Sequence, residues 1–122
     1  ITDEVDNLDK SFSGGIYDYH ALAMSRVKMR KELNTYFRGC MLQWDNTARR
    51  GEKASIFHNF SIDDYKRWLL DCTDYVHKFQ APEEQIVFIN AWNEWAEGTY
   101  LEPDETYGTK FLEATLEVLQ TR

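Results

Sequence analysis

The sequence has few basic residues and no long apolar run, and each shortage excludes a class of protein. Of its 122 residues only 14 are Lys or Arg against 21 Asp or Glu, so the formal net charge is −7. Such a surface is unsuited to phosphate backbones and anionic lipids. No apolar run approaches the roughly 18 residues that span a membrane. With 43% hydrophobic residues, we expect a globular protein with no nucleic-acid partner and no membrane insertion.

The start of the sequence also lacks familiar features. Residues 1–10 are polar and acidic, unlike the basic and then apolar start of a secretory signal peptide. There is no initiator Met. We therefore expect a processed chain or a segment of a longer protein.

Cysteine is scarce, with Cys40 and Cys72 as the two examples. Both fall within apolar patterns, and a chain of this length can bury a core without disulfides, so we expect buried, reduced thiols. No Cys or His spacing is typical of zinc, and there is no phosphate-binding glycine loop or nucleophile elbow. We expect no metal and no other cofactor.

Hydrophobic periodicity predicts three helices and two strands. Apolar residues recur at intervals of three and four over 17–35, over 61–79 and from 107 to the C-terminus, which is typical of amphipathic helices. Short apolar runs at 36–44 and 85–92 predict buried strands. We expect residues 1–15 to form an irregular lead-in and residues 45–53 to form a loop.

The alternation of these elements predicts an α/β fold with two parallel strands and three flanking helices. Two strands cannot form a closed sheet. A third strand lies in the lead-in, or partner strands come from residues or subunits outside this sequence. Exposed strand edges of this kind predict self-association of the chain.

The clearest functional pattern is NAWNEWAEGTYLEPD, residues 90–104, directly after the second predicted strand. In parallel α/β folds, ligands and catalytic groups lie at the carboxyl ends of strands. Glu94 and Glu97 are three residues apart, and a helical turn would place their Cβ atoms about 5–6 Å apart. Retaining glycosidases use two carboxyl groups separated by about 5–5.5 Å. The segment contains no Lys or Arg, unlike an ordinary solvated helix face, so we predict that this pair is catalytic.

Sugar-binding residues are predicted around this pair and at the end of the first strand. Aromatic side chains offer flat apolar faces for sugar rings, and amide and carboxylate groups bind hydroxyls. The predicted substrate-binding residues are Trp44, Asp45, Asn46, Trp92, Asn93, Trp95, Tyr100 and Glu102.

Two of these assignments have alternatives. Asp45 and Asn46 are also typical of turn caps. The neighbouring Arg49 and Arg50 suit either a phosphate clamp or a solvated loop.

Two blocks of sequence resemble a known family. Residues 88–108, FINAWNEWAEGTYLEPDETYG, resemble the C-terminal signature of the WbsX-like family. That family contains polysaccharide (lipopolysaccharide O-antigen) biosynthesis proteins described as glycosyltransferases, and it is similar to glycoside hydrolase family 99, the endo-α-mannosidases and endo-α-mannanases. Residues 39–50, GCMLQWDNTARR, resemble the family's strand followed by WDNTxRR. The resemblance covers roughly residues 16–120.

The resemblance implies a (β/α)8 TIM-type barrel, of which residues 1–122 would form the C-terminal segment. It also implies that Glu94 assists the sugar 2-hydroxyl as an internal nucleophile, while Glu97 acts as general acid and then base. Ala96 stands where the hydrolase family usually has His, so mannosidase activity does not follow from the resemblance. A bacterial cytoplasmic location is implied as well.

Three functions remain open at this point. The full-length protein is a glycosidase-like enzyme of bacterial surface polysaccharide metabolism, a glycosyltransferase that uses an activated sugar, or a non-catalytic carbohydrate-binding or interaction module. Because a site needs a rigid supporting shell, we expect the isolated segment to be inactive.

Overall fold

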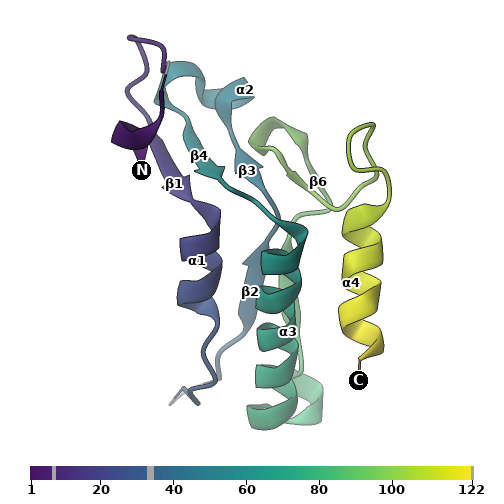
Figure 1. Cartoon of the computed structure of the whole chain (residues 1–122). Coiled ribbons are helices and arrows are strands. Elements are labelled where there is room, and N and C mark those ends of the chain that lie inside the picture. The colour runs from purple at the N-terminus through teal and green to yellow at the C-terminus, as the bar shows by residue number, and fades with distance from the viewer. Residues whose placement is uncertain (7, 33–34, 122) are drawn as a thin grey trace.

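The protein has a mixed α/β fold in a computed structural model that describes residues 1–6, 8–32 and 35–121 (Figure 1). The predicted α/β class is confirmed. No closed barrel is formed by the residues within these ranges. None of the helices in the described part of the chain has the length and apolar character that a membrane crossing needs.

Two pairs of parallel strands form the framework. β2 (Arg38–Met41) pairs with β5 (Val87–Asn90), and both lie inside the predicted strands, so the predicted parallel pair is confirmed. The second pair joins β1 (Gly15–Asp18) to β4 (Ser55–His58). β1 begins at the last residue of the expected lead-in, whereas β4 was not predicted. The lead-in also contains a short 3₁₀ turn, Thr2–Glu4.

The predicted strand over residues 36–44 is divided between two sheets. After β2 the chain leaves that sheet, and β3 (Trp44–Asp45) pairs antiparallel with β4. The expected loop over 45–53 is wrong, because it contains α2 (Thr47–Arg50) and a 3₁₀ turn, Gly51–Lys53. The Asp45 carboxylate accepts hydrogen bonds from the backbone N–H and the hydroxyl of Thr47, which supports the first turn of α2.

The predicted helix over residues 17–35 is too long. α1 spans Tyr19–Arg26, and Leu33 of the predicted apolar stripe lies outside the described residues. Asp18 marks the start of α1, because its side chain accepts a hydrogen bond from the Ala21 backbone N–H. Beyond Arg26 the sequence is strongly basic. Arg26 and Arg30 are four residues apart, and like charges at this spacing disfavour a continued helix.

The other two helices were predicted well. α3 spans Ile62–Phe79, and the Ser61 hydroxyl caps it by accepting a hydrogen bond from the Asp64 backbone N–H. α4 spans Lys110–Gln120 and begins three residues later than predicted. The helix starts later than predicted because Tyr107 belongs to the loop that precedes it.

The hydrophobic core lies around α3, which contacts β2, α1 and α4. Both cysteines are buried there, as predicted. The core consists of Tyr19, Ala23, Cys40, Leu42, Tyr65, Trp68, Leu69, Cys72, Phe111, Ala114 and Val118.

A buried ion pair joins β2 to α3. The guanidinium of Arg38 donates a hydrogen bond to the carboxylate of Asp71, and each side chain is only 5% exposed. The same guanidinium donates to the backbone carbonyl of Lys28 and lies 3.9 Å from the ring centroid of Tyr75. The charge of Arg38 is therefore satisfied on three sides inside the core, and removing it leaves Asp71 buried without its cation.

Replacing Arg38 by Met should lower the free energy of unfolding by about 3–5 kcal/mol, because it leaves a buried carboxylate unpaired. The exposed pair between Lys66 and Glu117, 2.7 Å apart, provides a control, and Lys66→Met should cost less than about 1 kcal/mol. Urea denaturation followed by circular dichroism measures both. Equal losses in the two variants would show that the Arg38–Asp71 pair has no special role.

Candidate functional site

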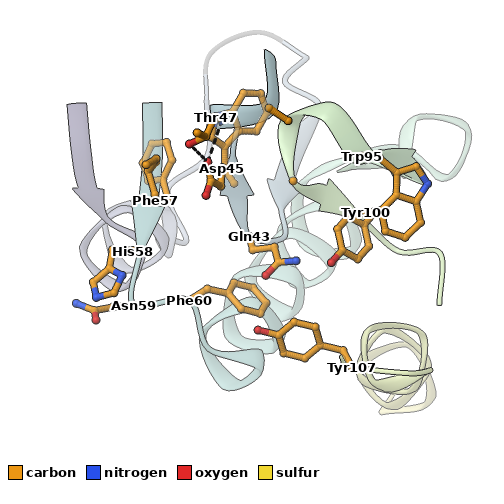
Figure 2. A pocket seen from close by; sticks show the side chains of 14 residues that line it. Gln43, Asp45, Thr47, Phe57, His58, Asn59, Phe60, Trp95, Tyr100 and Tyr107 are labelled. Atoms are coloured by element: carbon orange, nitrogen blue, oxygen red, sulfur yellow. Dashed lines mark hydrogen bonds between the residues drawn. The ribbon is translucent and has the colours of Figure 1, made fainter. Parts of the chain in front are cut away.

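A cavity of about 740 Å³ opens between the end of β4 and the segment that follows β5 (Figure 2). This volume is within the range of small-molecule sites, about 300–1,000 Å³. Its wall combines six aromatic residues with five polar ones. The lining residues are Gln43, Trp44, Asp45, Thr47, Ala48, Ile56, Phe57, His58, Asn59, Phe60, Trp95, Gly98, Tyr100 and Tyr107.

A short β-hairpin forms one side of this cavity. Its strands β6 (Asn93–Glu94) and β7 (Thr99–Tyr100) are antiparallel and are connected by a 3₁₀ turn, Trp95–Glu97. The Thr99 side chain is fully buried, and its hydroxyl donates a 2.7 Å hydrogen bond to the backbone carbonyl of Asn90. This bond ties the hairpin to the end of β5, where the sequence predicts the site.

Glu94 and Glu97 both lie on this hairpin, and neither lines the cavity. The turn between them is a single 3₁₀ turn that begins just after Glu94. Glu94 is exposed to solvent. The side chain of Glu97 is 22% exposed, and its Oε1 accepts a 2.8 Å hydrogen bond from Nη1 of Arg49 on α2. Arg49 therefore connects α2 to the hairpin.

Two aromatic residues of the hairpin, Trp95 and Tyr100, line the cavity. The ring centroids of Trp95 and Tyr100 are 4.0 Å apart. Trp95 Nε1 donates a 2.9 Å hydrogen bond to the Glu102 carboxylate, and the Tyr100 hydroxyl donates a 2.6 Å hydrogen bond to Asp104 Oδ2. Two carboxylates thus hold the two rings, and Glu102, predicted to bind substrate, bonds to Trp95.

The carboxylate of Asp104 also organises the loop before α4. It accepts a hydrogen bond from the backbone N–H of Tyr107, and Asp104 and Gly108 form a β-bridge. Tyr107 lines the cavity as a result. The hydrogen bond from the Tyr100 hydroxyl is the main cause of a lowered pKa of Asp104. Burial first, and then Asp104, raise the pKa of Tyr100 to about 12, so at neutral pH the tyrosine is neutral and the aspartate is charged.

Asp45 and Asn46 lie where β3 leads into α2, and Asp45 has the turn-capping role that the sequence left open, whereas Asn46 makes no side-chain cap to α2. Asp45 supports α2, while Oδ1 of Asn46 accepts a 2.7 Å hydrogen bond from the backbone N–H of Ser55. Gly98 lies against this segment with φ +63°, and a Cβ added there would be 2.7 Å from the backbone oxygen of Asp45. Only glycine allows the hairpin to approach this closely.

The cavity brings together part of the predicted site. Trp44, Asp45, Trp95 and Tyr100 line it. The remaining predicted binding residues lie outside the lining, and Trp92 is 53% exposed. They are Asn46, Trp92, Asn93 and Glu102.

Several lining residues were missed because they belong to β4, which the sequence did not reveal. His58 is the last residue of that strand, and Asn59 follows it directly. Asn59 has a φ of +59°, and its amide nitrogen donates a 3.3 Å hydrogen bond to Asp18 at the end of β1. Asn tolerates this left-handed backbone better than most residues. The sequence signal that could have found them is the pair His58 and Asn59, which stands between two aromatic residues, Phe57 and Phe60. No cluster of three or more metal-binding side chains occurs among the residues that the structure describes.

Residues 1–115 match the family described as Glycosyltransferase WbsX. The chain belongs to this family. It is 36% identical over 112 residues to two proteins of Xanthomonas campestris pv. campestris, from strains B100 and ATCC 33913, each named Uncharacterized protein WxcX. The alignments cover 92% of this chain and 16% of each relative. No solved structure matches the chain.

The close approach of Gly98 to Asp45 can be tested against a second glycine of similar backbone conformation. Gly108 has a φ of +57° and nothing within 4 Å of an added Cβ. Gly108→Ala should cost about 1–2 kcal/mol from the left-handed backbone alone. Gly98→Ala should cost about 1–3 kcal/mol more, because the new methyl group meets backbone.

Urea denaturation measures both losses, and the NMR signal of the Trp95 indole N–H should shift in Gly98→Ala and stay in place in Gly108→Ala. Equal losses and an unmoved signal would show that the hairpin does not depend on this contact.

Proposed function

We propose that the full-length protein acts on glycosidic bonds in the biosynthesis of bacterial surface polysaccharide, with Glu94 and Glu97 as its acid/base pair. Family membership supports the polysaccharide role. The observation on which the proposal chiefly rests is the hairpin, which places two carboxyl groups beside the aromatic wall of a 740 Å³ cavity. We place the sugar in this cavity.

The composition of the cavity suits a sugar. The rings of Trp95 and Tyr100 provide the apolar faces on which sugar C–H groups pack. Amide and hydroxyl groups on other sides of the cavity, from Gln43, Thr47 and Asn59, provide hydrogen-bond partners for hydroxyls. A largely apolar wall with a few converging polar groups is typical of a ligand site.

The hairpin also suggests how the carboxyl groups reach the sugar. Trp95 lies between Glu94 and Glu97 in the sequence and lines the cavity, and we propose that a sugar stacked on its ring reaches both carboxyl groups. One carboxyl group protonates the departing oxygen, while the other accepts a proton from the attacking or assisting hydroxyl. In a transferase the attacking hydroxyl belongs to a second sugar, which agrees with the family's description.

We further propose that residues 1–122 are the C-terminal segment of a (β/α)8 barrel. The face of β2 and β5 that points away from α3 is uncovered, with Phe88 61% and Phe37 44% exposed. Parallel sheets normally have both faces covered. The chain spans only 16% of the length of the relatives that it matches, so the full-length protein has ample residues for the remaining strands.

The acid/base assignment predicts a large loss on removing either carboxylate. Glu94→Gln and Glu97→Gln in the full-length protein should each lower activity by at least about 100-fold, because each removes a proton-transfer group. The measurement is restoration of surface polysaccharide in a strain from which the gene is deleted, with protein levels matched. Glu105→Gln, in the exposed loop that follows, is the control and should restore fully.

If Glu97→Gln restores polysaccharide as well as the natural protein, the catalytic assignment fails. Calorimetric titration with manno-oligosaccharides then tests the binding-module alternative, since equal affinity of the 122-residue chain and the full-length protein would support a self-sufficient module.

The barrel proposal predicts opposite effects of one substitution in two contexts. Phe88→Lys should leave the stability of the 122-residue chain within about 0.5 kcal/mol, because the side chain is exposed there. It should also reduce self-association of the chain, measured by sedimentation, since that face and its strand edges are the proposed contact. In the full-length protein the same change should prevent folding, because it buries a charge. Normal expression and stability of full-length Phe88→Lys would contradict the barrel.

A further inference from the structure

We propose that Gln43 is a sugar-specificity residue, oriented by a hydrogen-bond chain through Tyr100 to Asp104 so that its carbonyl oxygen accepts a hydrogen bond from a sugar hydroxyl. The inference rests on the proposed function, because it assumes that the cavity holds a sugar. Gln43 was not among the predicted site residues and lies between the end of β2 and the start of β3.

Gln43 stands between the two walls of the cavity. In Figure 2 its side chain lies between the β4 side, with Phe60, and the hairpin side, with Tyr100. Its amide nitrogen points toward the Tyr100 hydroxyl, and Gln43 lowers the pKa of Tyr100. The Tyr100 hydroxyl in turn donates to Asp104 Oδ2 at 2.6 Å.

The direction of this chain follows from the charge at its end. Asp104 is ionised at neutral pH because its pKa is lowered, so its oxygens only accept hydrogen bonds. Tyr100 has one hydroxyl proton, which is committed to Asp104, and its oxygen can then only accept. The Gln43 group that faces Tyr100 must therefore be the N–H donor. The nitrogen and oxygen of an amide side chain are normally assigned from such hydrogen bonds, and here they place the nitrogen toward Tyr100.

The opposing influences on Tyr100 agree with that direction. Asp104 raises the pKa of Tyr100, as a charged acceptor does, whereas Gln43 lowers it. A donor to the tyrosine oxygen stabilises the phenolate and lowers the pKa, so Gln43 acts as the donor.

The oriented amide selects for a particular chemistry. Once one N–H is used on Tyr100, the carbonyl oxygen of Gln43 is left to accept a hydrogen bond inside the cavity. A sugar hydroxyl can donate to it, whereas a phosphate cannot and would also face the charge of Asp104. The site at Gln43 therefore suits a neutral polyhydroxyl ring. Any phosphate of an activated sugar would lie elsewhere.

The hydrogen-bond chain can be tested without a ligand, by titrating Tyr100 in the 122-residue chain. Gln43→Leu should raise the pKa of Tyr100, and Asp104→Asn should lower it, because each removes one of the two opposing partners. Absorbance at high pH and NMR of the tyrosine ring carbons measure the change, and Tyr100→Phe assigns the signal. Gln85→Leu, whose amide bonds to the Gln80 carbonyl away from the cavity, should change nothing. A lowered or unchanged pKa in Gln43→Leu would overturn the chain.

The sugar contact requires a binding measurement on the same variants in the full-length protein. The probes are manno-, gluco-, galacto- and rhamno-oligosaccharides, measured by calorimetry and saturation-transfer NMR. Gln43→Leu should weaken the probe that binds by about 10-fold or more, because it removes a hydrogen bond on which the site depends. Gln85→Leu should bind normally.

The outcomes separate the two proposals. If the natural protein binds a probe and Gln43→Leu binds it equally well, the role of Gln43 is wrong and the proposed function stands. If the natural protein binds none of the probes, the carbohydrate site itself is contradicted, and the sugar contact of Gln43 falls with it.

Discussion

The packing of the apolar face of α3 against β2 holds the rest of this protein in position. Helix formation alone provides little stability, so an 18-residue amphipathic helix depends on what its apolar face buries. Here that face contacts β2, α1 and α4 together, and the Arg38–Asp71 ion pair joins it to the start of β2. A buried ion pair adds little net energy but penalises every arrangement in which one partner is left alone. Two of the segments that line the cavity, those containing Phe60 and Tyr107, directly precede α3 and α4, so their position follows from this packing.

The parts of the fold that were predicted from the sequence are those with a long or unmixed hydrophobic pattern. α3 has six apolar positions in continuous helical spacing, and the segment containing β5 shows as a run of apolar residues. β1 and β4 have four residues each and are mostly half-exposed, so neither has a pattern that differs from a loop. The length of α1 was overestimated because the apolar periodicity continues past Arg26. That periodicity counts only apolar residues and takes no account of the basic residues that disfavour a longer helix.

The site was predicted in part for similar physical reasons. Residues 90–104 could be identified from the sequence because carboxylates and aromatic rings crowd there within one segment after a strand. The other side of the cavity comes from residues 43–60, which tertiary structure places opposite, and no local pattern reports such a pairing. Trp95 and Tyr100 were predicted as binding residues, but the hydrogen bonds from their side chains to Glu102 and Asp104 can be found only in the structure. The proposed role of Gln43 likewise could not be predicted from the sequence, because it depends on Asp104, a residue far from it along the chain.

The order of the strands has a consequence for how the chain folds. β1 pairs with β4 and β2 pairs with β5, so the two pairings interleave along the chain. Any cut between β1 and β5 separates at least one pair, and a cut between β2 and β4 separates both. The chain therefore has no half that can fold on its own, and its sheets can form only after distant segments meet, which makes folding cooperative and comparatively slow. On a ribosome, the β2–β5 sheet must wait until β5 has been made, and the cavity must wait for the segment that follows β5.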